Sequence, residues 1–260
     1  MIALLATLAL AAPCPDGGMA EGPVTAGLLD GNLGQARRAC PRTEASLGAG
    51  ATLVADVDAF YGHIQAGATL GGSLALGEGT ELFATFEALR YDALLSPFPS
   101  SVLGLGHTAL GAGQRLYADE QTVLALHGKA VLPTAVGLYQ HAWPLGFDLG
   151  LAWRFRAAEH LTLHANLAAL TSFALSAGPA LPRAGIAPTL GVEVRPWQAF
   201  GAVADLVGRF GVDAPVDVLG AALALRAGGA HLGAELGATV PLAGRERALA
   251  TVDLRVTWRP

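Results

Sequence analysis

Apolar and polar residues alternate with a period of two along most of the chain from residue 43 onward. Between residues 47 and 57, for example, every odd position is leucine, alanine or valine, and most even positions are glycine, threonine or aspartate. Side chains of a β-strand point alternately to its two faces, so this period predicts strands with one apolar and one polar face. Neither face of segment 102–117 is clearly polar, but counting it gives twelve strands. They are expected near residues 47–57, 64–76, 82–88, 102–117, 124–132, 147–155, 161–167, 186–194, 200–206, 219–225, 232–238 and 252–258.

The joins between the expected strands alternate between short and long. The short joins are 77–80, 118–121, 157–160, 196–199 and 228–230, and the long ones are 58–62, 92–101, 134–146, 171–184, 211–217 and 243–247. This asymmetry is typical of transmembrane β-barrels, which have tight turns on the periplasmic side and longer loops outside. An even number of strands would place both ends of the barrel domain on the periplasmic side.

Composition supports a membrane location without helices. Charged residues make up 14% of the chain, against about 25% in ordinary soluble domains, and hydrophobic residues make up 52%. Disorder is therefore excluded, and a net charge of −5 argues against a nucleic-acid partner. No stretch reaches the roughly 20 apolar residues that a spanning helix needs. Lipid offers no hydrogen bonds to a backbone, so a closed barrel is the other structure that can cross it.

Aromatic residues gather near the ends of the expected strands, where the girdles of membrane barrels lie. Tyr117, Trp153 and Trp197 flank short joins. On these patterns the region 43–260 resembles bacterial outer-membrane β-barrel proteins of the porin and transporter kind. The resemblance is to the class, and it implies an antiparallel up-and-down barrel of about twelve strands in the bacterial outer membrane. It also implies outer-membrane lipid and the barrel-assembly machinery as partners. Such proteins usually end on an aromatic residue, whereas here Trp258 is followed by Arg259 and Pro260.

The first 42 residues differ in character from the rest. Residues 1–11 predict a secretory signal peptide, because an apolar run ends in small residues, although the charged start is missing. Residues 12–42 then form a periplasmic segment in which 26–38 could be a helix that caps the barrel mouth, or a disordered leader. The two cysteines, Cys14 and Cys40, predict one disulfide in an oxidising compartment. A lipid-modified Cys14 or two reduced thiols are the alternatives.

Charged residues on the polar faces are the candidates for a functional lumen. Mixed signs would give a water-filled path with little ion preference, or the charges would pair and fill a narrow lumen. Both interpretations stay open. The lumen-lining candidates are Glu87, Lys129, Asp148, Arg154, Arg156, Glu193, Arg195, Asp205, Arg209, Arg226, Glu235, Asp253 and Arg255.

Catalytic and metal-binding patterns are weak. No histidine is followed two residues later by serine, as in outer-membrane phospholipases, and His164 has Asn166 in that place. Asp56 and Asp58 could serve a protease or hold a cation, but they have the character of a turn-flanking acidic pair. The histidines on polar faces, His63, His127, His164 and His231, have no local ligand spacing. We expect no enzyme activity, no cofactor and no metal.

The sequence therefore predicts a narrow porin or passive transporter of small solutes. A competing hypothesis is a non-transporting barrel with a structural or adhesive role through loops 134–146 and 171–184. A barrel lipase or protease is a third class, and a soluble sandwich is a fourth. The pattern does not indicate an oligomeric state.

Overall fold

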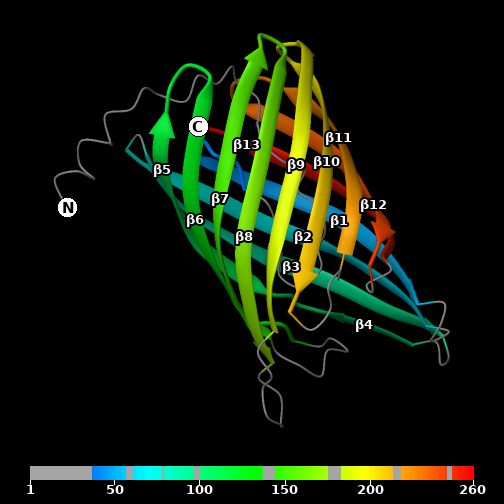
Figure 1. The fold of residues 1–260 in the computed structure, drawn as a ribbon. Helices are drawn as coiled ribbons and strands as arrows, with labels where there is room; N and C mark the ends of the chain where they lie inside the picture. Colours follow the sequence, from blue (N-terminus) through cyan, green and yellow to red (C-terminus); the bar gives the residue numbers. More distant parts are fainter. Residues whose placement is uncertain are drawn as a thin grey trace.

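The computed structural model describes residues 37–56, 61–77, 79–96, 100–136, 144–174, 183–212, 218–244 and 248–260. The expected signal peptide, Cys14, Asp58 and most of the candidate helix at 26–38 lie outside these ranges. The described residues form an antiparallel barrel (Figure 1). Its strands are β1 (Glu44–Asp56), β2 (Tyr61–Leu76), β3 (Thr80–Ser96), β4 (Ser100–Gly104), β5 (Thr108–Ala118), β6 (Thr122–Leu132), β7 (Pro144–Ala158), β8 (Leu161–Ala174), β9 (Arg183–Trp197), β10 (Phe200–Gly211), β11 (Val218–Gly228), β12 (Leu232–Ala243) and β13 (Ala248–Trp258).

The sheet closes on itself through its first and last strands. β1 pairs with β13 from Ala45↔Trp258 to Val54↔Ala248. Every other pairing joins strands that follow one another along the chain, except that β3 pairs with both β4 and β5. β4 and β5 count as one wall strand, because β3 pairs with β4 over Arg90–Leu94 and with β5 over Thr80–Phe86. The wall therefore has twelve strands, and the predicted fold class and strand number are confirmed.

The break between β4 and β5 is organised by Glu87. The Glu87 amide donates to the carbonyl of His107, and the Gly106 amide donates to the carbonyl of Glu87. The Glu87 carboxylate also accepts a hydrogen bond from the His107 amide at 3.0 Å. A Cβ atom at position 106 would overlap that carboxylate, so the bend requires glycine.

One predicted join is wrong. β3 continues to Ser96 and β4 begins at Ser100, so the long join expected at 92–101 is reduced to three residues. The cause is a β-bulge: Ala68 of β2 pairs with Leu89, but Thr69 pairs with Glu87, which leaves Ala88 as an extra residue. Beyond the bulge, the inward positions of β3 change from odd to even, so a strict period of two ends at Ala88.

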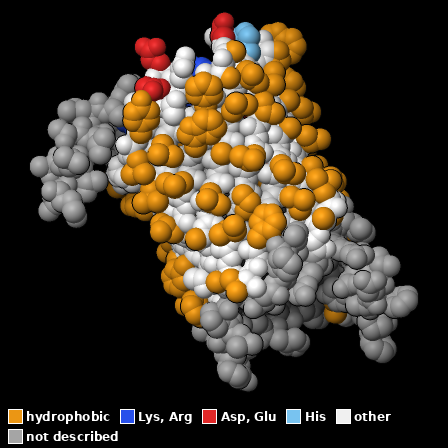
Figure 2. Space-filling model, in the orientation of Figure 1, with side chains coloured by type: hydrophobic (Ala, Val, Ile, Leu, Met, Phe, Trp, Pro, Cys, Tyr) orange, Lys and Arg blue, Asp and Glu red, His pale blue; other side chains and the backbone are white. Residues whose placement is uncertain are grey.

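The outer surface of the barrel is apolar. Leucines such as Leu149, Leu190 and Leu223 are about 60% exposed along the middle of their strands. Figure 2 shows hydrophobic side chains spread over this face, with acidic side chains and a histidine gathered at one rim. Among the described residues, no helix is long and apolar enough to cross a membrane. A continuous exposed apolar surface of this extent fits contact with acyl chains.

Aromatic residues ring the end of the barrel that carries the short turns, here called the short-turn end. Trp197 and Phe200 flank the β9–β10 turn with ring centroids 6.1 Å apart. Trp153 and Phe155 stack near the β7–β8 turn with centroids 5.9 Å apart. Tyr117 donates a hydrogen bond to the carboxylate of Asp119 at 2.6 Å, and the same carboxylate accepts the Gln121 and Thr122 amides of the β5–β6 turn. These positions match an interfacial girdle.

Candidate functional site

The inner wall of the barrel is polar and tightly filled. Asp92, Glu193 and Thr52 are each 1% exposed, which is the burial of a soluble protein's core. Small apolar groups interrupt the polar wall in two places, around Val123 with Ala125 and Ala152, and around Val203 with Ala222 and Ala224. Where these polar and small apolar side chains are buried, they fill the interior of the barrel.

All thirteen charged residues predicted to line the lumen lie on the inner face. Eight of them are buried: Glu87, Lys129, Asp148, Arg154, Glu193, Asp205, Arg226 and Glu235. The other five are partly buried on the same face: Arg156, Arg195, Arg209, Asp253 and Arg255. The structure brings several of them into direct ion pairs. One is Lys129 with Asp148, whose Nζ and Oδ2 atoms lie 3.0 Å apart across β6 and β7.

Further charged residues share this face although the sequence pattern did not single them out. Arg90 and Asp92 lie beyond the β3 bulge, and Arg90 contacts both Asp92 at 3.3 Å and Glu87 at 3.4 Å. Glu81, Arg115 and Arg259 lie near strand ends, where few alternating neighbours mark the face. A charged residue next to a short turn can equally well be exposed to solvent. Only the pairing register of the strands shows that these three side chains face the lumen.

Four charged residues of β9, β11 and β12 form a network across the inner face near the short-turn end. Arg226 of β11 donates from Nε to Glu235 of β12 at 2.6 Å and from Nη1 to Glu193 of β9 at 3.1 Å. Arg195 donates to the other oxygen of Glu193 at 2.8 Å. Each carboxylate is thus neutralised by a guanidinium, which makes the burial of Glu193, Arg226 and Glu235 possible.

A buried histidine and aspartate meet across a glycine. His164 of β8 and Asp205 of β10 lie on either side of Gly191 in β9, and both are directly opposite it in register. The atoms His164 Nε2 and Asp205 Oδ1 are 2.6 Å apart, with side-chain exposures of 2% and 0%. A Cβ atom on Gly191 would overlap both groups. The contact therefore depends on glycine at this position.

Replacing Gly191 by alanine should destabilise the barrel by about 1–3 kcal/mol, the usual cost of overpacking. Gly113 is a matched control on the inner face, because the nearest atom to its added Cβ is 3.7 Å away. Tryptophan fluorescence during urea unfolding in lipid vesicles measures both variants. Equal stability of Gly191→Ala and Gly113→Ala would contradict the proposed steric role.

The chain segment just before β1 lies inside the lumen, and we call residues Arg37–Thr43 the plug. Arg38 is its main anchor: its guanidinium lies 2.6 Å from Glu44, 2.6 Å from Glu81 and 3.0 Å from the Ser73 hydroxyl. Burial opposes its charge, but the Glu44 and Glu81 carboxylates raise the pKa of Arg38 above its ordinary value. The anchor joins the plug to β1, β2 and β3.

The rest of the plug reaches the opposite wall. The Arg37 amide donates to Asn166 Oδ1 of β8 at 2.9 Å, and its guanidinium stacks 3.6 Å above the Phe83 ring of β3. Burial lowers the pKa of Arg37 to about 10, so it stays charged at neutral pH. Cys40 is disulfide-bonded and packs against Val123, Ala125 and Ala152. Its expected partner Cys14 lies outside the described residues.

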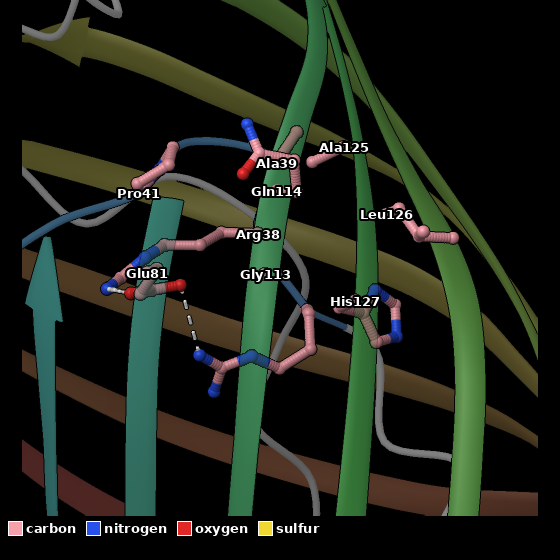
Figure 3. A pocket seen from close by; sticks show the side chains of 10 residues that line it. Arg38, Ala39, Pro41, Glu81, Gly113, Gln114, Ala125, Leu126 and His127 are labelled. Atoms are coloured by element: carbon pink, nitrogen blue, oxygen red, sulfur yellow. Dashed lines mark hydrogen bonds and ion pairs between the residues drawn. The ribbon is translucent and has the colours of Figure 1, made fainter. Parts of the chain in front are cut away.

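A small cavity separates the plug from β5 and β6. Figure 3 shows Arg38 facing Glu81 on one side of this cavity, with His127 on the other. Its volume of about 10 Å³ is at the lower limit of the space needed to hold one water molecule. Neither ring nitrogen of His127 is hydrogen-bonded within the described part of the chain. No group of three or more potential metal ligands occurs among the described residues. His231 lies apart at the rim, and the side chain of His63 is outside the description.

No family model and no curated protein matches this sequence. Several solved structures match its fold. The COG4313 outer membrane channel from Pseudomonas putida F1 aligns with a TM-score of 0.66 at 12% identity, over 89% of this chain and 99% of that one. The KdgM porin in complex with disordered oligogalacturonate aligns with a TM-score of 0.54 at 10% identity, over 83% and 99%. The β domain of the Bordetella autotransporter BrkA also gives 0.54, at 13% identity, over 85% and 100%. The likeness concerns the fold: this chain has the closed twelve-stranded architecture of outer-membrane porin and autotransporter barrels.

Proposed function

We propose that the protein is a narrow passive channel of the bacterial outer membrane for small hydrophilic solutes. The main support for this proposal is that the two faces of the barrel wall differ: leucines cover the outer face, and paired charges line the inner face. Lipid requires the first face, and a hydrated path requires the second. The porin-like fold supports this function. With short turns toward the periplasm, Trp258, 55% exposed, would be available to the assembly machinery.

In this conformation the lumen is closed near the short-turn end. The plug crosses the lumen from Glu81 on β3 to Asn166 on β8, and the charged network occupies the neighbouring wall. Conduction then requires the plug to move. The contacts that hold it are mainly polar, so water and permeating ions can replace them when it leaves.

A non-transporting structural barrel is the second candidate, and the tight filling of the lumen favours it. Catalysis has less support. The strongest acid–base pair, His164 with Asp205, is at most 2% exposed and leaves no room for a substrate. We infer a role without catalysis or cofactor.

Planar-bilayer recording from the purified full chain tests the proposal. We expect infrequent openings of small conductance, and flux of small sugars or amino acids into loaded vesicles. Weak ion preference is expected in a salt gradient, because the lumen carries both signs. If neither the wild type nor a variant lacking the Arg38 anchor passes current or solute, the channel hypothesis is wrong and the structural role stands.

A further inference from the structure

The plug occupies a site on the inner wall that neighbouring strands build together. Four residues form it, and we call them the plug-binding site: Glu44 of β1, Ser73 of β2, and Glu81 and Phe83 of β3. Glu44 pairs with Ser73 in register, and Ser73 pairs with Phe83, so these residues lie in one row across the sheet. Glu81 is the next inward position of β3 toward the short turn. Backbone pairing of the wall, rather than the plug, sets the spacing of the site.

Arg38 fills one part of the plug-binding site with charged hydrogen bonds. Its Nη1 atom lies 2.6 Å from the Glu44 carboxylate, and its Nη2 atom lies 2.6 Å from Glu81 and 3.0 Å from the Ser73 hydroxyl. The two carboxylates thus accept from different nitrogens of one guanidinium. A guanidinium presents its N–H donors in a fixed planar fork, whereas an ammonium is a compact point charge. This arrangement of acceptors therefore fits a guanidinium group.

An aromatic ring completes the plug-binding site beside Glu81. The guanidinium carbon of Arg37 lies 3.6 Å from the centre of the Phe83 ring, and an Arg37 nitrogen lies 3.4 Å from Glu81. The Phe83 ring lies against Gly111, its register partner in β5, where a Cβ atom would overlap it. A buried aromatic face next to a carboxylate favours a planar, weakly hydrated cation over a compact, strongly hydrated one.

Departure of the plug would leave Glu81 without its ion-pair partners. Within the described part of the chain, both of its ion pairs are made with the plug, through Oε1 to Arg38 and through Oε2 to Arg37. Glu44 keeps a more distant partner, Arg259, at 3.9 Å. The low-dielectric wall of a narrow lumen focuses the field of such carboxylates, so they attract a replacement cation. The vacated site therefore favours a ligand with the chemistry of the group that left it.

We propose that the plug-binding site of the open barrel binds small solutes that carry a guanidinium group, such as free arginine. In the closed barrel the plug arginines occupy the place that the solute takes in the open one. The inference rests on the proposed channel function and names the class of solute. Solute and plug then exclude each other, so a solute that binds the site shifts the barrel toward the open state.

Binding to the variant Arg38→Ala tests the proposal without any need for conduction. The substitution empties the part of the site that makes the charged hydrogen bonds. In calorimetric titrations of the purified full chain, we expect L-arginine to bind this variant at least about tenfold more tightly than the wild type, whose own Arg38 competes. Arg38→Gln empties the same part with a smaller loss of volume, and it takes the place of Arg38→Ala if that variant does not fold.

Two related amino acids separate the contributions of charge and shape. L-Citrulline resembles arginine in shape but has no charge on its side chain, and we expect no binding. L-Lysine has the charge without the planar fork, and we expect it to bind at least about tenfold more weakly than arginine. The order of the three affinities therefore identifies the group that the site recognises.

Wall substitutions in the Arg38→Ala background locate the binding. Glu81→Gln removes the shared carboxylate and should weaken arginine binding at least about tenfold, because a charged hydrogen bond is lost. Phe83→Leu keeps both carboxylates and should narrow the difference between arginine and lysine, because the aromatic face is lost. Glu159→Gln is the matched control: it removes a carboxylate that is 88% exposed in the β7–β8 turn and should leave binding unchanged.

The outcomes separate this inference from the channel function. No arginine binding to the emptied site, equal affinity for the three amino acids, or binding that Glu81→Gln does not weaken overturns the inference. These results leave the channel function intact, because bilayer recording of the wild type tests it separately. Arginine binding in a barrel that never passes current or solute overturns the channel function instead. Where both hold, arginine should raise the open fraction of the wild type and citrulline should not.

Discussion

Replacing Arg38 by alanine should raise the open probability of the reconstituted barrel at least about tenfold. Arg38 makes charged hydrogen bonds to Glu44 and Glu81, both at 2.6 Å. Each bond of this kind contributes about 1.5–3 kcal/mol, and a change of about 1.4 kcal/mol alters an equilibrium tenfold. The substitution also leaves the two carboxylates without their shared cation. The plugged state should therefore lose stability relative to the open one, which single-channel recording measures as the open fraction.

Arg37→Ala is the matched control for this experiment. Arg37 lies in the same plug, but its ion pair with Glu81 is longer, at 3.4 Å, and its side chain is 23% exposed against 12% for Arg38. A smaller increase in open fraction is expected. Thermal unfolding of both variants distinguishes plug release from general loss of structure. If Arg38→Ala folds normally and opens no more often than the wild type, the plug is not the gate.

Replacing Leu223 by arginine should destabilise the membrane-inserted barrel by about 2–4 kcal/mol. Leu223 is the middle residue of β11 and is 63% exposed on the outer face. A cation there would lie near the bilayer midplane, where its burial in hydrocarbon has this cost. Unfolding by urea in lipid vesicles, followed by tryptophan fluorescence, measures the free-energy difference.

Leu232→Arg provides the depth control. Leu232 is similarly exposed, at 59%, but it is the first residue of β12 beside a short turn. At the interface the cost falls to about 0–1 kcal/mol, because the guanidinium reaches water. Equal losses for the two variants would show that the outer face does not sit in lipid as proposed.

The period of two was sufficient to predict the barrel because two solvents act on the wall at once. Lipid selects leucine on one face and the lumen tolerates charge on the other, so alternation persists even where individual strands are short. The same physics predicts inward positions for residues such as Asp148 and Arg226, and both lie on the inner face of the barrel. The alternation of short and long joins predicted which end of the barrel carries the tight turns.

Irregular features of the barrel could not be predicted from the alternation of apolar and polar residues. The bulge at Ala88 shifts the face of every following residue, and no local signal separates it from the end of a strand. Arg90 and Asp92 were missed for this reason. The position of the plug is equally non-local, because Arg38 finds its partner Glu81 some 43 residues away along the chain. Which charges pair depends on register, which alternation alone does not specify.

The pairing of β1 with β13 has a consequence for how the chain folds. Every other strand pair joins neighbours in sequence, so those hairpins have low contact order and little loop-closure entropy to overcome. The Ala45↔Trp258 contact spans nearly the whole domain. Until it forms, two strand edges with free backbone groups face the lipid, which is the costliest state available to them. Formation of this single junction should therefore be the slow step of folding, and it turns an open sheet into the closed ring that surrounds the plug.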